Sequence, residues 1–167
     1  CFRTRTNTGS RYSRTRTATM MQQNDRVQKG ESMTSEANKE LIRHIMEDGF
    51  NKQDMSVVYE SFHEDYVRHG HGVASMGSLA EHVEDLIARH KAFDDAKFTI
   101  HKIVGDGDTV AVQFDFTGVH SGDFNGVPVS GNKVIRPAAA FFTIRDGKVS
   151  EGTVFADGAD FMAQLQD

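Results

Sequence analysis

The chain has 167 residues, with 19 Lys and Arg, 24 Asp and Glu, and a formal net charge of −5 at neutral pH. This size suits one domain whose core is large enough to fold without disulfides or metals. A single cysteine, Cys1, excludes an internal disulfide framework and a multi-cysteine zinc site, and favours a reducing compartment. No apolar run approaches the roughly 18 to 20 residues that span a bilayer, so no membrane segment is expected.

Charge is distributed unevenly along the chain. Residues 1–32 carry seven Lys or Arg and two Asp or Glu, a net charge of +5, whereas residues 33–167 carry twelve and twenty-two, a net charge of −10. Because nucleic-acid binding depends on neutralising phosphates with basic side chains, nucleic acid is not expected as a partner of the acidic part. We therefore expect a basic tail over residues 1–32 and one domain over residues 33–167.

The tail is rich in Arg, Thr and Ser and has no acidic residue before Asp25. This composition cannot bury enough apolar surface to offset chain entropy, which predicts disorder. One interpretation is an organelle transit peptide, which would direct the protein to a plastid or mitochondrion. The other, which we favour, is a non-native extension ahead of a translation start at Met33, because structure is predicted to begin just after that residue. The second interpretation predicts a cytoplasmic protein.

Three helices are predicted in the first half of the domain. Residues 34–35, a Thr-Ser pair, can cap a first helix that Gly49 would end. Asp54 can cap a short second helix. Residues 78–81, Ser-Leu-Ala-Glu, form a capping box in front of a third helix that runs to about Ala92. Its apolar stripe consists of Leu79, Val83, Leu86 and Ile87. Its acidic residues and those that follow are interpreted as a solvated face and loop: Glu81, Glu84, Asp85, Asp94 and Asp95.

The apolar period then changes from 3.6 to 2, which predicts strands. A first strand covers residues 98–104, and a second places one set of side chains on a single face: Val110, Val112, Phe114, Phe116 and His120. A third strand covers about residues 132–145. Asp146-Gly147 then forms a tight hairpin into a fourth strand that ends near Asp157. A short helix over residues 159–165 closes the chain.

Helices followed by a meander of antiparallel strands predict an α+β fold. A curved antiparallel sheet wrapped around the N-terminal helices would leave an apolar cavity between the two. The loop over residues 122–131 is rich in glycine but contains neither a GxGxxG nor a GxxxxGK[ST] pattern, and it joins strand to strand. A nucleotide phosphate site is therefore not expected.

His120 and Asp157 are the first candidates for chemistry. His120 has the parity of the apolar face, so it is either a proton carrier that faces the cavity or a core histidine satisfied by a backbone group. Asp157 shares parity with Val149 and Phe155. A carboxylate among apolar neighbours would have a raised pKa suited to acid/base work, but Asp157-Gly158 is equally good helix-capping chemistry.

His69 and His71 follow the second helix at a spacing that points both rings the same way on an extended segment. Further metal ligands at a suitable spacing are missing, so no metal site is expected. A single histidine that lines the cavity beside Tyr66 is the preferred interpretation. Arg136 has the inward parity of the third strand: it would pair with an inward carboxylate, hold an anionic substrate group, or lie at an edge marked by Pro137.

Four segments in order resemble the SnoaL-like polyketide cyclases, or ester cyclases, of the nuclear transport factor 2-like superfamily. They are Phe62–His69 (FHEDYVRH), Gly118–Gly131 (GVHSGDFNGVPVSG), Phe142–Lys148 (FTIRDGK) and Asp157–Leu165 (DGADFMAQL). The resemblance spans about residues 36–165. It implies a cone-shaped curved sheet and helices around a deep apolar pocket, no cofactor and no metal, and homodimerisation through the outer face of the sheet.

The resemblance also implies an activity, the closure of a ring by intramolecular aldol condensation of a small apolar carbonyl compound. The family's aspartate at the end of the last long strand matches Asp157, which would act as general base. Two family histidines match His120 and His69, either of which would donate to the enolate oxygen. Thr153 stands where the family often has tryptophan, which implies a differently shaped pocket. The expected substrate contacts are Tyr66, Phe62, Arg136, Phe114 and Phe142.

Two other functions are compatible with the same fold. One is a non-catalytic domain that binds a small apolar ligand. The other is epoxide hydrolysis by an Asp-Arg-Asp set, of which Arg136 and Asp157 could supply two members. The usual Arg-x-Asp spacing is missing, because residue 138 is Ala, so we rank this function last.

Overall fold

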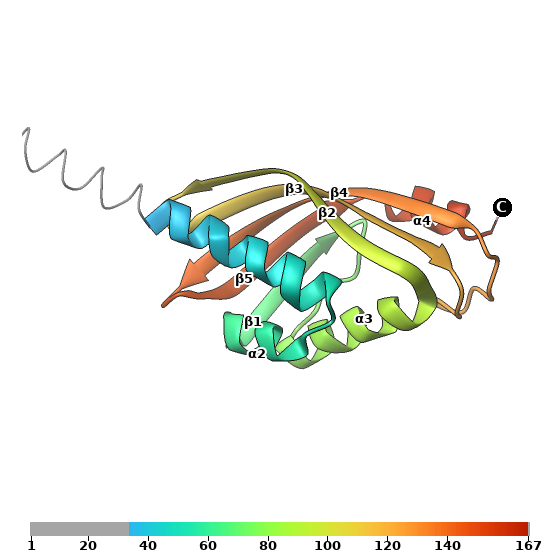
Figure 1. The fold of residues 1–167 in the computed structure, drawn as a ribbon, viewed down its shortest axis with the longest axis horizontal. Coiled ribbons are helices and arrows are strands. Elements are labelled where there is room, and N and C mark those ends of the chain that lie inside the picture. The colour runs from blue at the N-terminus through green and yellow to red at the C-terminus, as the bar shows by residue number, and fades with distance from the viewer. Residues whose placement is uncertain (1–33, 167) are drawn as a thin grey trace, which may run out of the picture.

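The computed structural model describes residues 34–166, so the predictions about the tail and Met33 lie outside the described residues. A helix over residues 34–44 continues as the π-helix η1 (Ile45–Asn51), and a curved sheet arches over it (Figure 1). The other elements, in chain order, are α2 (Met55–Ser61), β1 (Phe62–His71), α3 (Leu79–Ala92), β2 (Phe93–Asp106), β3 (Thr109–His120), β4 (Lys133–Arg145), β5 (Lys148–Ala156) and α4 (Gly158–Gln164).

The described strands form one five-stranded sheet in the order β1-β5-β4-β3-β2. The expected α+β architecture with a curved sheet is confirmed. The expectation of a wholly antiparallel sheet is wrong, because β1 pairs with β5 in parallel. The sequence did not reveal β1, since a register shift between Phe62 and Val67 interrupts the alternation of buried and exposed residues.

The helix caps and helix ends agree with the sequence predictions, with one exception. Asp54 caps α2 by accepting from the Ser56 amide at 3.1 Å, and Ser78 caps α3 by accepting from the Glu81 amide at 3.2 Å. Gly49 does not end the first helix, which runs on as a π-helix to Asn51. The Asn51 side chain accepts from the amide of Phe98 at 2.7 Å and donates to its carbonyl at 2.9 Å, which fixes the helix end to β2.

The sheet's concave face is apolar because alternate residues of each strand point toward the helices. On β3 the whole predicted set is buried, from Val110 to His120. The predicted hairpin between β4 and β5 is confirmed by positive φ angles of 52° at Asp146 and 74° at Gly147.

A β-bulge near Ser150 changes the parity of β5. Thr143 pairs with Glu151, but Ile144 pairs with Val149, so one extra residue lies on β5 between these pairs. Val149 is buried before the bulge, whereas after it Gly152 is buried and Phe155 is 44% exposed. Extrapolating the parity of Val149 to Asp157 therefore gives the wrong face.

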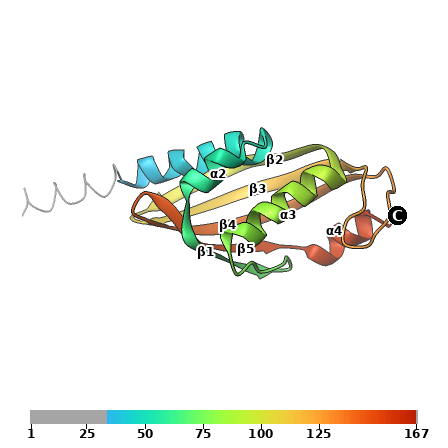
Figure 2. The same ribbon diagram turned by 90° about the horizontal axis from the view of Figure 1, so that it is seen from below.

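Helices cover the concave face of the sheet and close one end of it. Seen from below, α3 lies obliquely across the strands, the N-terminal helix runs along the side of the sheet near β2, and α4 lies beyond the end of β5 (Figure 2). Phe161 of α4 packs 5.7 Å from the ring of Phe93 and 6.0 Å from that of Phe116, which closes the aromatic core at this end. None of the described helices is long and apolar enough to cross a bilayer.

Candidate functional site

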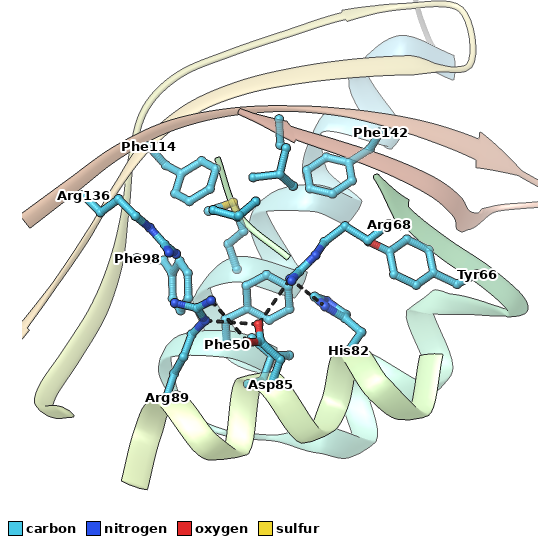
Figure 3. A pocket seen from close by; sticks show the side chains of 15 residues that line it. Phe50, Tyr66, Arg68, His82, Asp85, Arg89, Phe98, Phe114, Arg136 and Phe142 are labelled. Atoms are coloured by element: carbon cyan, nitrogen blue, oxygen red, sulfur yellow. Dashed lines mark hydrogen bonds and ion pairs between the residues drawn. The ribbon is translucent and has the colours of Figure 1, made fainter. Parts of the chain in front are cut away.

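A small cavity of about 50 Å³ lies between α3 and the concave face of the sheet (Figure 3). At roughly 10 to 15 Å³ per water, it has room for a few waters or a small ligand group. A wider hollow of about 550 Å³ lies outside it and shares Val73, Asp85, Arg89 and Arg136 with the cavity lining. These shared residues lie between the two spaces, and we call this place the neck.

Five aromatic side chains line the cavity: Phe50, Tyr66, Phe98, Phe114 and Phe142. The structure therefore places three of the expected contact residues, Tyr66, Phe114 and Phe142, on the wall. Phe62 does not line the cavity; its ring packs edge-on behind Tyr66 at 4.7 Å. Contact of Tyr66, Phe114, Phe142 and Phe62 with a substrate stays a prediction.

A buried ion-pair cluster forms the polar side of the cavity (Figure 3). Asp85 of α3 accepts from Arg89 one helical turn later, with Nε at 3.1 Å and a second guanidinium nitrogen at 3.2 Å. Arg68 of β1 reaches the same carboxylate at 3.3 Å. Arg68 also donates to the Ala74 carbonyl at 3.1 Å, so its guanidinium joins the carboxylate on α3 to the loop that follows β1.

The electrostatics of Asp85 and His82 follow from this cluster. Burial raises the pKa of Asp85, but the charges and hydrogen bonds of Arg89 and Arg68 outweigh burial and hold it below its usual value. Burial, together with the charge of Arg68, lowers the pKa of His82 to about 3, so its imidazole is neutral at physiological pH. Since Arg68 only donates, His82 accepts from it through Nδ1 at 3.3 Å and carries its proton on Nε2.

Arg136 reaches the cavity from β4, which lies inside the sheet, so the edge interpretation of this residue is wrong. Its side chain is buried over the rings of Phe161 and Phe116, with the guanidinium carbon 4.8 Å and 5.6 Å from their centroids. Within the described residues no carboxylate lies within ion-pair distance of it. Burial, with the charge of Arg89, lowers the pKa of Arg136 to about 9, which leaves it charged at neutral pH.

Tyr66 lines the cavity, and its hydroxyl is buried without a hydrogen-bond partner in the described part of the chain. Burial raises the pKa of Tyr66 above its usual value, so the group stays protonated. A Cβ atom on Gly152 would lie 2.7 Å from this oxygen, so glycine is the residue that leaves room for it. Tyr66 is therefore a neutral donor at the cavity.

Asp157 is exposed and lies outside this cavity. Its carboxylate caps α4 by accepting from the Asp160 amide at 2.9 Å, which is the capping role that the sequence left open. The inward orientation expected from strand parity is wrong, because the bulge near Ser150 reverses that parity. Asp157 borders an open hollow on the outer surface instead, together with His71. Its assignment as the general base stays a prediction.

His69 points away from the cavity. The expectation that this histidine lines the cavity beside Tyr66 is therefore wrong. Its ring is 53% exposed and pairs with Glu151 at 3.0 Å. His71 stacks on Phe155 with ring centroids 4.5 Å apart. Among the described residues, no group of three or more His, Cys, Asp or Glu side chains is arranged to hold a metal ion.

His120 points inward as expected, but it belongs to the core and not to the cavity lining. Its Nδ1 lies 2.9 Å from the Ser130 hydroxyl across the loop, and its ring packs 5.5 Å from that of Phe93. Nε2 is buried without a partner among the described residues. The loop that follows supplies Phe124 and Asn125 to the outer hollow, so the loop borders the site although His120 does not.

Four residues of the cluster were not expected as site residues from the sequence: Arg68, His82, Asp85 and Arg89. A signal for them existed. His82, Asp85 and Arg89 recur at intervals of three and four beside Leu79 and Leu86, so they extend the apolar stripe of α3, whereas Ile87 is 39% exposed. Arg68 has the parity of Tyr66 on β1. A charged residue within an apolar periodicity needs a partner, and these supply one another.

A curved mixed sheet that encloses a small cavity with helices defines an α+β cone. Residues 40–165 match the family model described as SnoaL-like polyketide cyclase, so the chain belongs to this family. Among curated proteins, none matches the chain significantly.

Solved structures agree with this assignment. A candidate SnoaL-like polyketide cyclase from Jannaschia sp. CCS1 is 25% identical, with a TM-score of 0.72 over 79% of this chain and 93% of that one. The candidate polyketide cyclase IdmH from Streptomyces antibioticus is 26% identical, with a TM-score of 0.67 over 78% and 99%. An epoxide hydrolase of M. tuberculosis described as LEH-like is 15% identical, with a TM-score of 0.62 over 79% and 91%, and shares the fold.

Proposed function

We propose that this protein is a cofactor-independent cyclase that closes a ring in a small carbonyl compound by an aldol-type reaction. The observation that carries the proposal is a cavity whose lining holds one carboxylate, Asp85, among guanidinium, imidazole and phenol donors. Such a reaction needs a base near an acidic C–H bond and donors for the enolate oxygen that forms. Membership of the cyclase family supports the same reaction class.

We assign the base to Asp85. Proton removal from a carbon between two carbonyls moves the C–H electron pair into an enolate while the carboxylate takes the proton. The enolate carbon then attacks a second carbonyl of the same molecule, and the resulting alkoxide takes the proton back from the Asp85 carboxylic acid, which restores the carboxylate. The low pKa of Asp85 makes it a weak base, so stabilisation of the enolate must supply much of the rate.

Candidate donors for the enolate oxygen lie in the same cavity as the Asp85 carboxylate. Arg136 and Tyr66 line the cavity, and Arg136 Nε and the Tyr66 hydroxyl are buried without a hydrogen-bond acceptor among the described residues. Preorganised donors in a water-poor site stabilise developing charge without reorganisation. This arrangement gives the donor role to Arg136 and Tyr66, whereas His120 and His69, which the family resemblance suggested, lie off the cavity lining.

Proton exchange tests the proposal without knowledge of the natural substrate. A panel of β-keto esters, half of them with a free carboxylate elsewhere in the molecule, is incubated in D₂O, and loss of the proton between the carbonyls is followed by NMR. We expect the protein to accelerate exchange for at least one ester, and Asp85→Asn to reduce that acceleration by about 100-fold or more, because a general base typically contributes at least that factor. Absence of acceleration across the panel would contradict the cyclase proposal.

Asp157→Asn is the matched comparison for Asp85→Asn. Both variants remove one negative charge, but an Asn side chain at residue 157 can still cap α4. We expect Asp157→Asn to keep its exchange rate within about 2-fold of the parent protein, because the variant leaves the cavity lining unchanged. A large loss in a folded Asp157→Asn protein, with Asp85→Asn unaffected, would return the base to Asp157.

We also propose that two copies associate through the outer face of the sheet. Ile135, Phe141 and Phe155 are each more than 40% exposed there, and the rings of Phe141 and Phe155 lie 6.3 Å apart. Exposed apolar patches of this kind mark contact surfaces. Light scattering should give a dimer mass that Phe141→Glu halves; a monomeric parent protein would contradict the proposal.

A further inference from the structure

The cavity holds more buried positive charge than its own residues neutralise. Arg68, Arg89 and Arg136 carry three positive charges against the single negative charge of Asp85, a net charge of +2 among the ionised groups of the lining. Asp85 already accepts from Arg68 and Arg89. Buried charges are normally paired, so the unpaired guanidinium of Arg136 indicates a binding site for an anion.

Arg136 has the geometry of a binding group. It is 8% exposed, its Nε is buried without a partner in residues 34–166, and no hydrogen bond to its other nitrogens is found there. Figure 3 shows it descending from β4 toward Arg89, which rises from α3. Both guanidinium groups lie over the ring of Phe116, at 5.6 Å and 5.8 Å from its centroid. Stacking of this kind holds the planar groups in place without using their donors.

The two arginines also mark where an anion would enter. Arg89 and Arg136 line both the inner cavity and the outer hollow, so they lie at the neck between the spaces. Arg89 Nη1 is likewise buried without a partner among the described residues. An anion at this neck would bind the planar donors of Arg136 on the side away from the Asp85 carboxylate. The aromatic wall of the inner cavity would then take an apolar body.

We propose that the substrate of this site is a carboxylic acid in its ionised form, whose carboxylate binds Arg136 and Arg89 at the neck while its ketone-bearing, apolar end enters the inner cavity. The inference rests on the proposed function for the identity of the site and adds the class of substrate. A neutral ester of the same acid lacks the charge that the neck requires. The preference for acid over ester therefore distinguishes this substrate class from the uncharged carbonyl compound that the sequence predicted.

Calorimetric binding to the full chain tests the proposal with matched probes. Three acids, 4-oxopentanoate, benzoate and phenylacetate, are compared with their primary amides in buffer of low chloride content. We expect at least one acid to bind about 10-fold or more tightly than its amide, and Arg136→Gln to abolish that preference. Arg145→Gln removes an exposed arginine that pairs with Asp65 on the outside, and it should keep the preference. Equal binding of acid and amide for all three pairs, or a preference that survives Arg136→Gln, would overturn the proposal.

Two further variants keep the test decisive. Arg136→Lys retains the charge but not the planar pair of donors, so it should fold and weaken the acid preference; an unchanged preference would contradict planar recognition by Arg136. Asp85→Asn removes the negative charge that opposes the anion, so acid binding should strengthen while proton exchange is lost. If exchange persists in Asp85→Asn but its acid binding strengthens, the base assignment fails and the anion site stands. If acid binding does not strengthen, the anion does not lie in this cluster.

Discussion

Two regions of the molecule hold charged residues close to β5, and they behave in opposite ways. On the outer surface, His69, Glu151 and Asp157 pair or cap in contact with solvent. In the cavity, three arginines are buried around a half-buried Asp85, and two of them, Arg89 and Arg136, lie over aromatic rings. An unpaired charge in water costs little free energy, whereas an unpaired buried charge costs much more and therefore favours binding of an opposite charge. The face on which a residue lies therefore decides whether its charge can do chemistry.

Removal of each region's aspartate is expected to give the largest contrast in stability. Asp85→Ala leaves Arg68 and Arg89 buried without their carboxylate, which should cost about 3–5 kcal/mol of unfolding free energy. Asp157→Ala removes a helix cap and should cost about 1 kcal/mol. Urea unfolding followed by circular dichroism measures both. Equal losses in the two variants would mean that the buried cluster is not tightly coupled.

Acid should destabilise the protein through His82. Its pKa is 6.5 in an unfolded chain and about 3 in the folded protein, so the unfolded chain takes up a proton that the folded state excludes. Stability should therefore fall as the pH falls from 6 to 4, by about 1.4 kcal/mol per unit from this residue. The pKa of Asp85 is also lowered in the folded protein. The stability that this carboxylate contributes is therefore lost only when the pH falls below about 3.8, its value in an unfolded chain.

His82→Gln isolates that contribution, because glutamine does not titrate. Urea unfolding at pH 6, 5 and 4 should show a shallower loss of stability in the variant than in the parent protein. Parallel pH profiles for the two proteins would show that His82 is not held neutral in the folded state.

A methyl group added at Gly152 should test how closely the cavity wall is packed. The new Cβ would lie 2.7 Å from the Tyr66 hydroxyl and 3.3 Å from the Phe142 ring, which must shift. Gly152→Ala should cost about 1–3 kcal/mol, and it should also change ligand binding. Gly77→Ala is the surface control, because its Cβ would meet only the end of the Glu81 side chain at 3.8 Å. If Gly152→Ala left the unfolding free energy unchanged, the side chains around Tyr66 and Phe142 would not be closely packed.

The sequence predicted the parts of the fold where local pattern and tertiary environment agree. The alternation of β3 gave the buried face, the capping box gave the start of α3, and Asp146-Gly147 gave the hairpin. It failed where the chain departs from regular geometry. Register shifts hide β1 and reverse β5, so Asp157 was assigned to the wrong face.

The candidate site was predicted in part. Arg136, Phe114 and Phe142 were placed on the cavity side because each follows a strand parity that no bulge interrupts before it. Tyr66 was expected there from the family resemblance and not from strand parity. Asp85 was interpreted as solvated because charged residues on a helix are usually exposed. Its burial depends on Arg68, which comes from another element, and no local pattern reports a pairing between residues 17 positions apart.

The most direct test of a cationic cavity observes the arginines themselves. In the unmodified full chain, NMR of the arginine Nε–H groups is recorded while 4-oxopentanoate is added, with its primary amide as the neutral comparison. We predict that the acid shifts the signals of Arg136 and Arg89 in a saturable way, leaves that of Arg145 on the outer surface unchanged, and that the amide shifts none of them. Saturable shifts at Arg145 alone, or no shift at Arg136, would contradict the account.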